Sequence, residues 1–369
     1  MVSIARQILL HDRLRFIITV VSLGVAIVMI LYDLGMFISV TSDSVNVVNH
    51  ASADVWVAQK GEGNLLSGSL LPVDMLGTIR NLAGVRQTCA VGYSAGSVKV
   101  TQTHQAQIIA VDPACPLIQP WGVVDGDPTR LQQSETIVVD DFLSRGNHGI
   151  RIGEELKLND RDMRVVGITH GNRSFSSSLV YISLQTFELV GGKPGFISFI
   201  AVQLQPGVDR AQFIRQVTEI DARLVVLAES KFKQATITAL IAQGLGMIFV
   251  VVFVGVLVGV LIISLTLYTA TMEQLRDFAV LKALGATRWK IWGVVLEEAL
   301  TETTVSFLIG LALSLSVDAL VFSTSGIRGS FPLWLIFASY TGLLLLALVG
   351  SLLSIRKATS VDPVMVFRA

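Results

Sequence analysis

The chain has 369 residues, of which 52% are apolar and only 15% charged, and its mean hydropathy is +0.65. An ordinary soluble domain carries about 25% charged residues, so this composition excludes a simple cytosolic enzyme. Basic and acidic residues each number 28, the formal net charge is zero, and the lack of a basic run disfavours a nucleic-acid partner. Residues 41–233 hold 19 acidic and 17 basic residues, well over half of all the charges, and therefore resemble a water-soluble domain.

Four long stretches outside that domain are almost free of charge: 16–40 holds only Asp33, 303–327 holds only Asp318, and 234–272 and 329–355 hold no charge. A helix needs about 20 apolar residues to cross about 30 Å of hydrocarbon. We therefore expect transmembrane helices in residues 16–40, 234–272, 297–322 and 332–355. The second stretch is too long for one crossing, so its first part is predicted to form a stalk and its span to cover about residues 241–268. The predicted fold is a four-helix membrane protein with an extracytoplasmic α+β domain, residues 41–233, between helices 1 and 2.

Basic residues in the short flanking segments predict the orientation. One side carries Arg6, Arg13 and Arg15, then Arg276, Lys282, Arg288 and Lys290, and finally Arg356, Lys357 and Arg368. The opposite short loop, 323–331, has only Arg328. Because short cytoplasmic loops are rich in Lys and Arg, both termini are expected in the cytoplasm of a bacterium, with the protein in the inner (plasma) membrane. Loop 273–296 and tail 356–369 would then be cytoplasmic.

The first apolar stretch could also be read as a cleaved signal peptide. Its length and the lack of an A-x-A-like site after it favour a membrane span instead. Residues 1–15 place Ile4, Ile8 and Leu9 opposite Arg6 and Arg13, which is typical of a helix lying in the cytoplasmic interface.

Residues 41–233 alternate short β-like runs with turn residues. Strands are predicted at 53–57, 97–101, 107–111, 136–139, 155–158, 163–168, 179–182, 197–204 and 224–227. Helical periodicity is found in residues 72–82 and 208–220. Residues 112–189, which contain a predicted Asn159-Asp160 turn, are interpreted as an inserted β-rich subdomain.

Several motifs in the chain suggest chemistry. Ser94 lies in a G-x-S-x-G sequence, but a strand pattern rather than a helix follows it, so a serine nucleophile is disfavoured. The histidines have no ligand spacing, and no P-loop is present, so neither a metal site nor a cofactor is expected in this chain. Cys89 and Cys115 would lie in an oxidising compartment. Either a disulfide or two buried thiols is consistent with their sequence, the thiols being the commoner outcome.

Two features lie inside the predicted spans. Gly255 and Gly259 form a G-x-x-x-G motif, which favours either association with a second helix or ordinary packing within the chain. Asp33 lies in the outer half of span one. It is interpreted either as a substrate or partner contact, together with Met29, Tyr32 and Met36, or as a helix-end carboxylate reaching water. Asp318, near the outer end of span three, is expected at the interface.

The loop between spans two and three carries the most informative sequence. Its amphipathic segment, with apolar Leu275, Phe278 and Leu281, stops at Gly285. Its motif Leu281-Lys282-Ala283-Leu284-Gly285-Ala286, a glutamate early in the next span and the tail motifs Arg356-Lys357-Ala358, Asp362-Pro363-Val364 and Phe367-Arg368 resemble the FtsX-like, MacB-type permeases of ABC transporters. Within that group, the sequence Ala53-Asp54-Val55-Trp56-Val57 is most similar to DevC/HrtB-like exporter permeases.

The resemblance implies a non-catalytic, homodimeric permease that works with a separate cytoplasmic ATPase, which would bind the ATP and Mg. By position, it assigns ATPase coupling to Glu273, Arg276, Ala279, Leu281, Lys282, Ala283, Leu284 and Gly285. A short helix with one apolar face suits docking into a partner's groove. ATPase movement would be relayed by mechanotransmission to the external domain, driving export or extraction of an amphipathic substrate.

Other functions remain open at the level of sequence. A periplasmic adaptor and membrane lipid are further partners that the resemblance allows. One alternative is an FtsX-like transducer that regulates an extracytoplasmic enzyme or sensor and transports nothing. A membrane-anchored hydrolase using Ser94 is the other alternative, and it requires Ser94→Ala to abolish activity.

Overall fold

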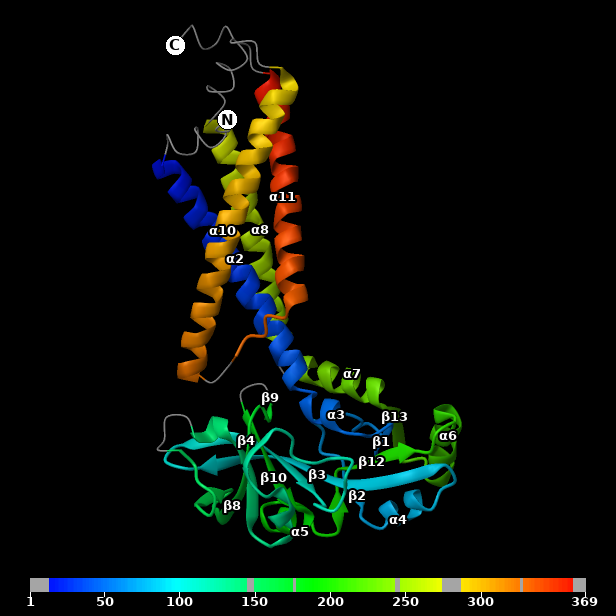
Figure 1. Cartoon of the computed structure of the whole chain (residues 1–369). Helices are drawn as coiled ribbons and strands as arrows, with labels where there is room; N and C mark the ends of the chain where they lie inside the picture. Colours follow the sequence, from blue (N-terminus) through cyan, green and yellow to red (C-terminus); the bar gives the residue numbers. More distant parts are fainter. Residues whose placement is uncertain are drawn as a thin grey trace. The chain divides into compact units, whose positions relative to one another are not determined.

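A computed structural model describes residues 13–144, 149–174, 177–242, 246–273, 287–325 and 328–360 (Figure 1). It divides the chain into two compact units, which we describe separately. The helical unit comprises Met1–Ser39 and Met247–Ala369, and the sheet unit comprises Val40–Gly246.

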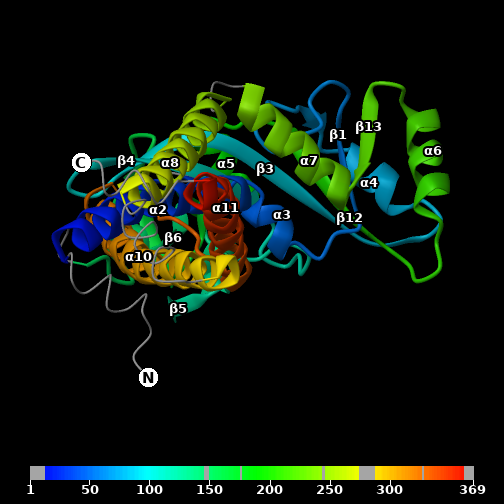
Figure 2. The same cartoon turned by 90° about the horizontal axis from the view of Figure 1, so that it is seen from above.

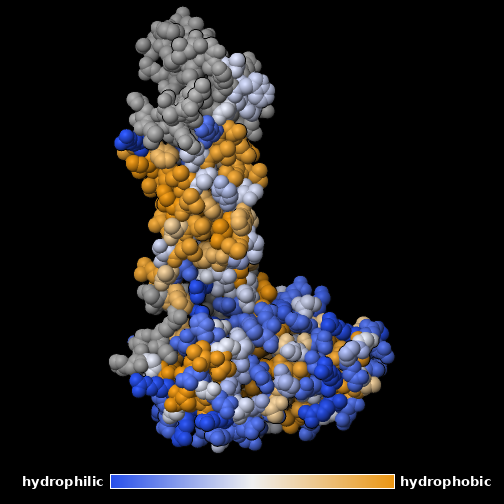
Figure 3. All heavy atoms as spheres, in the orientation of Figure 1, coloured by the Kyte–Doolittle hydropathy of each residue, from blue (hydrophilic) through white to orange (hydrophobic). Residues whose placement is uncertain are grey.

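The helical unit contains four long helices over the predicted spans. They are α2 (Arg13–Asp43), α8 (Gly246–Glu273), α10 (Arg288–Ser325) and α11 (Leu333–Ser360). Residues Phe16–Asp43 and Ala299–Phe322 are long and apolar enough to cross a membrane, while α8 and α11 hold shorter described apolar stretches, Val250–Ile262 and Leu333–Val349. The coloured part of this unit's face in Figure 3 is largely hydrophobic. The number of crossings stays a prediction.

The sheet unit is built on one mixed sheet of 11 strands. Its main path runs β13-β1-β12-β3-β4-β10-β6-β8-β5, with β7 against β3 and β8, and β9 against β10. The strands are β1 (Val55–Gln59), β3 (Val85–Lys99), β4 (Thr103–Val111), β5 (Val123–Gly126), β6 (Thr136–Asp140), β7 (Glu155–Leu158), β8 (Arg161–Thr169), β9 (Arg173–Ser174), β10 (Ser177–Ser183), β12 (Phe199–Leu204) and β13 (Leu224–Ala228). A separate pair joins β2 (Leu71–Pro72) to β11 (Phe196–Ile197).

Short helices complete this unit. They are α3 (Asn46–His50), α4 (Met75–Arg80), α5 (Leu184–Leu189), α6 (Arg210–Ile220) and α7 (Glu229–Leu240), with 3₁₀ turns η1 (Pro128–Gln132) and η2 (Asp141–Ser144). Figure 2 shows α4, α6 and α7 beside the β1–β12–β13 half of the sheet. The unit therefore has the predicted α+β content.

The long strand β3 joins the two halves of the sheet. Its first part, from Val85 to Val91, pairs antiparallel with β12, and its second part, from Val91 to Lys99, pairs with β4. The segment predicted as an inserted subdomain supplies β5 to β10 and α5, which extend this same sheet. The sheet therefore runs without interruption from one half to the other.

Local comparison shows where the sequence patterns were accurate. Asn159 and Asp160 both have positive φ, as a tight turn between β7 and β8 requires. The strand predicted at 97–101 is only the end of β3, because Gly92 and Gly96 interrupted the apolar alternation there. Residues at the start of the predicted stalk instead belong to α7, whose Phe232, Thr236 and Leu240 are buried in the sheet unit.

Candidate functional site

The α2 helix provides the core of the helical unit. Five of its side chains form a buried cluster with three residues of α10 and α11, and the cluster consists of Leu23, Ala26, Ile27, Ile30, Leu31, Phe307, Leu343 and Ala347. Gly310 of α10 lies so close to α2 that a Cβ there would be 2.6 Å from the Cγ2 of Ile27. Close helix packing through small residues is typical of membrane helices, which lack a hydrophobic drive to associate.

The G-x-x-x-G motif of α8 faces α2. A Cβ on Gly259 would be 2.6 Å from the Cγ1 of Ile30, and a Cβ on Gly255 would collide with the carboxylate of Asp33. Asp33 follows Ile30 by three residues, so one face of α2 meets one face of α8. The motif therefore takes part in packing within the chain, which is one of its two interpretations.

Asp33 is half-buried beside Gly255 and accepts no hydrogen bond from any described residue. Tyr32 and Met36 on the same helix are also half-buried, whereas the side chain of Met29 is 38% exposed. A carboxylate in a largely apolar helix costs free energy when it has no partner. Asp33 therefore stays a candidate contact for a group outside the described residues. The roles of these four residues stay predictions.

Asp318, whose position at the interface stays a prediction, is buried within the helical unit. Only 8% of it is exposed, and its Oδ1 accepts the backbone N–H of Gly329 at 2.6 Å. The neighbouring Ser330 N–H donates to the carbonyl of Gly35 at 2.9 Å, and Phe331 covers that glycine. Asp318 therefore fixes the connection between α10 and α11 onto α2.

Two short helices, α3 before the first strand and α7 after the last strand, contact different strands of the sheet. In α3, the Nδ2 of Asn46 donates to the carbonyls of Gly171 and Arg173 at 3.3 and 3.2 Å. The ring of His50 stacks on that of Trp121, with centroids 4.0 Å apart. These partners follow β8 or precede β5. The polar and ring contacts of α3 therefore join it to the part of the sheet that contains β5 and β8.

The α7 helix, where the chain leaves the sheet unit, packs on β1 and β12. Its Phe232 stacks on Trp56 of β1 with centroids 4.9 Å apart, and it meets Phe199 of β12 edge-on at 5.4 Å. The Oγ1 of Thr236 accepts the Leu65 N–H at 3.0 Å. The α3 and α7 helices thus bind different strands through these contacts, while Val47 and Val48 of α3 and Phe232 of α7 share one buried cluster.

A buried polar network lies beneath the α3 contact. The carboxylate of Asp140 accepts the backbone N–H groups of Asn172 at 2.7 Å and Phe142 at 3.1 Å. The side chain of Asn172 donates to the Trp121 carbonyl and accepts from the hydroxyl of Tyr181. Burial raises the pKa of Asp140 to about 6, although the two backbone donors act against this shift. The network therefore joins the ends of β6, β8 and β10.

Cys89 and Cys115 form a disulfide, with their Cα atoms 6.0 Å apart. Free thiols had been the commoner expectation. The structure differs because β3 places Cys89 beside the loop after β4, a proximity that no sequence spacing reveals. The bond ties that loop to the sheet.

Ser94 is not a nucleophile at a strand-to-helix turn. It lies within β3 and pairs with Ile108 of β4. The elbow geometry of serine hydrolases is therefore missing, which overturns the hydrolase alternative on structural grounds.

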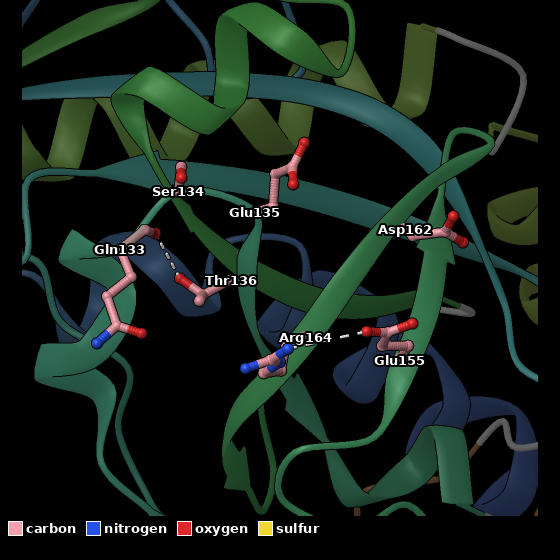
Figure 4. Close-up of a pocket in the computed structure, with 7 residues that line it drawn as sticks. All are labelled: Gln133, Ser134, Glu135, Thr136, Glu155, Asp162 and Arg164. Carbon is pink, nitrogen blue, oxygen red and sulfur yellow. Dashed lines mark hydrogen bonds and ion pairs between the residues drawn. The ribbon is translucent and has the colours of Figure 1, made fainter.

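A polar cleft of about 280 Å³ lies between the β7–β8 hairpin and the chain before β6 (Figure 4). It is lined by Gln133, Ser134, Glu135, Thr136, Glu155, Asp162 and Arg164. The Arg164 guanidinium lies 3.9 Å from Glu155, and both side chains are about two-thirds exposed. Such exposed pairs are worth about 0–1 kcal/mol, and this hydrated cleft offers little to an apolar ligand.

Comparison with known proteins decides the family. Residues 16–220 match the model of the MacB-like periplasmic core domain, and residues 249–363 match that of the FtsX-like permease C-terminal region. The chain belongs to this family of ABC transporter permeases. It is 22% identical to an uncharacterized ABC transporter permease of Mycobacterium tuberculosis, over 96% of this chain and 95% of that one. It is 21% identical to the ABC transporter permease YknZ of Bacillus subtilis, over 67% and 68% of the two chains.

Two solved structures are also similar to about half of this chain. The periplasmic region of MacB from Actinobacillus actinomycetemcomitans has 13% identity and a TM-score of 0.39, and the match covers 52% of this chain and 95% of that one. The extracellular domain of YknZ has 10% identity and a TM-score of 0.37, with 48% and 100% covered.

In this permease, the predicted coupling residues are mostly beyond direct description. Glu273 is the last residue of α8, and Arg276, Ala279, Leu281, Lys282, Ala283, Leu284 and Gly285 lie outside the described residues. The chain re-enters the described structure with α10, where Trp289 and Trp292 form a ring pair at 6.1 Å. Aromatic residues of this kind are enriched at membrane interfaces.

Proposed function

We propose that this permease is the membrane subunit of an ABC transporter that couples ATP hydrolysis in a separate subunit to export or extraction of an amphipathic substrate. It crosses the membrane four times, with both termini in the cytoplasm and the sheet unit outside. Two copies form a homodimer and work with cytoplasmic ATPase subunits that bind ATP and Mg. The chain itself is not catalytic.

The observation that best supports mechanotransmission is the way the sheet unit is held. The chain enters the sheet unit from α2 through α3. Asn46 and His50 of α3 contact the segments that follow β8 and precede β5. The chain leaves the sheet unit towards α8 through α7, whose Phe232 packs on Trp56 of β1. A relative displacement of α2 and α8 would therefore pull on two different parts of one sheet.

The coupling end is assigned to the segment after α8. A bulky residue at Gly285 or a reversed charge at Glu273 would disturb a short helix seated in the ATPase. The movement of the ATPase would then no longer reach α8 and α10, although the protein would still insert into the membrane.

The test begins with affinity purification of the tagged full-length chain in mild detergent, followed by mass spectrometry of what accompanies it. We expect a P-loop ATPase in equal amounts, and Glu273→Arg or Gly285→Trp should abolish stimulation of its ATP hydrolysis by this subunit. Thr287→Ala, at an exposed position just beyond the segment, is the matched control and should leave stimulation unchanged. Purification without any ATPase, under conditions that preserve other such complexes, contradicts the proposal.

The second candidate is a transducer that regulates an external enzyme or sensor. The grip of α3 and α7 on the sheet serves this role equally well, since it requires movement but no transport. Recovery of an extracytoplasmic enzyme together with the ATPase would favour it over export.

A further inference from the structure

Two neighbouring cavities on the sheet unit form a groove that no function has been assigned to. One has a volume of about 360 Å³ and the other about 180 Å³. Both are lined by Val111 and Pro113, so they share one wall. Together they fall in the range of roughly 300–1,000 Å³ that is typical of small-molecule sites.

The smaller cavity is the apolar end of this groove. Ile118 and Leu131 are almost completely buried and lie at its base, and Val123 at its side is 43% exposed. Pro113, Pro120 and Pro128 supply further walls. This cavity can remove an apolar group from water at about 25 cal/mol for each Å² of surface buried.

The larger cavity adds polar groups to a partly apolar lining. Its lining includes the carboxylate of Asp112, the amides of Gln132 and Gln185, and Ser183. Neither amide forms an intramolecular hydrogen bond with a described residue. Asp112 uses only its Oδ1, which accepts the Ala114 N–H at 2.9 Å. Acceptors are therefore free to bind a polar or cationic head.

The loop that lines both cavities is held in place before any ligand arrives. Cys115 is tied to β3 by its disulfide, and its backbone N–H donates to the Asp112 carbonyl at 2.8 Å. Further along the loop, the Leu117 carbonyl accepts the Ser52 N–H at 2.9 Å. A preformed site loses less conformational entropy when it binds than a mobile loop does.

We propose that this groove, the Val111–Pro113 groove, binds a small amphipathic molecule, with its apolar body against Ile118 and Val123 and a protonated amine beside Asp112. This inference rests on the proposed export of an amphipathic substrate and gives that substrate a positively charged head. The groove would hold the molecule outside the membrane spans, on the part of the sheet to which the α3 helix is fastened.

A small molecule suits the site better than an added strand of another protein. The neighbouring edge strand β5 has only four residues, and its pairing with β8 is irregular between Val123 and Asp125. Gly122 precedes this strand and Gly126 is its last residue, and both have positive φ. Short, irregular edges of this kind are typical of strands that avoid pairing with other chains.

The test measures binding of tryptamine to the purified full-length chain in detergent by isothermal titration calorimetry. Tryptamine joins an indole body to a protonated amine, and indole-3-propionate has the same body with an anionic head. We expect saturable binding of tryptamine and binding of the propionate weaker by about tenfold, because its charge meets Asp112. The measurement uses no ATPase, so failure here leaves the coupling assignment standing.

Matched variants then test the site itself. Val123→Glu should weaken tryptamine binding about tenfold, because it places a charge against the apolar body. Val124→Glu is the control, since Val124 is 66% exposed and does not line either cavity. Asp112→Asn keeps an oxygen for the Ala114 N–H but should cost about threefold, the scale of an exposed ion pair.

Several outcomes would overturn the proposal. They are the absence of saturable tryptamine binding, equal binding of the amine and the acid, and equal losses for Val123→Glu and Val124→Glu. A Val123→Glu variant that binds tryptamine normally but changes the sedimentation of the chain would instead identify this edge as a protein contact.

Discussion

Removal of the Cys89–Cys115 disulfide should destabilise the sheet unit by a predictable amount. The bond joins positions 26 residues apart in sequence. In the chain-entropy description, freeing a loop of that length increases the entropy of the unfolded chain by about 12 cal/mol/K, or about 3.5 kcal/mol at 25 °C. A folded unit of roughly 200 residues loses about 2–4 °C of Tm for each kcal/mol, so a decrease of about 7–14 °C is expected.

The assay is thermal unfolding of the full-length chain, comparing the native protein with Cys89→Ala/Cys115→Ala. Trp56 and Trp121, packed against Phe232 and His50, report on the sheet unit, and a variant with Trp289, Trp292 and Trp334 replaced by Phe in both proteins removes the signal of the helical unit. Dithiothreitol should lower the Tm of the native protein towards that of the variant and leave the variant unchanged.

The pattern of the result separates cross-linking from packing. The two sulfurs are nearly buried, so replacing them also removes some apolar contact. A decrease under 2 °C in both comparisons would refute the argument that the loop after β4 depends on this bond. A decrease in the variant alone, with no effect of reductant, would attribute the loss to packing.

Three further predictions concern other parts of the chain. Because the folded pKa of Asp140 is about 6, above its ordinary value of 3.8, the folded state holds the proton more tightly; lowering the pH from 7 to 5 should stabilise the sheet unit by about 1 kcal/mol in chemical denaturation, and Asp140→Asn should remove that gain. Asn46→Ala should lose about 1 kcal/mol and speed hydrogen exchange after β8, whereas Asn49→Ala, at an exposed position, should match the native chain. Gly255→Leu should cost about 1–3 kcal/mol in thermal unfolding through its collision with Asp33; a loss that Asp33→Ala does not partly relieve would show that the two residues do not meet.

The alternation of apolar residues predicted most strands of the sheet unit, and the Asn159-Asp160 turn was confirmed, because these signals are local. Pairing between distant strands leaves no such signal, which is why the continuity of β3 through both halves was missed. The same limit applies to Cys89 and Cys115, whose contact depends on how β3 and β4 lie in the sheet.

In the helical unit, sequence identified Asp33 and Gly255 separately but could not join them. Each signal concerned a single helix: a charge in an apolar stretch and a spacing of small residues. Their contact depends on which faces of α2 and α8 meet, and that choice is made by all the helices packing together. The groove at Val111 and Pro113 escaped detection for a related reason, since its walls come from separate turns of the chain.

The order of strands also has a consequence for how the protein is made. Among the described strands, β1 pairs only with β12 and β13. Neither edge of β1 can therefore be covered until Val202 and Ala228, the partners of Val55, have been synthesised. The segment from β4 to β10 pairs mostly within itself and can assemble earlier. Until the last strands arrive, β1 offers the apolar sequence Val-Trp-Val-Ala with both edges open. The pairing order therefore makes β1 the strand most exposed to wrong pairing before the sheet is complete.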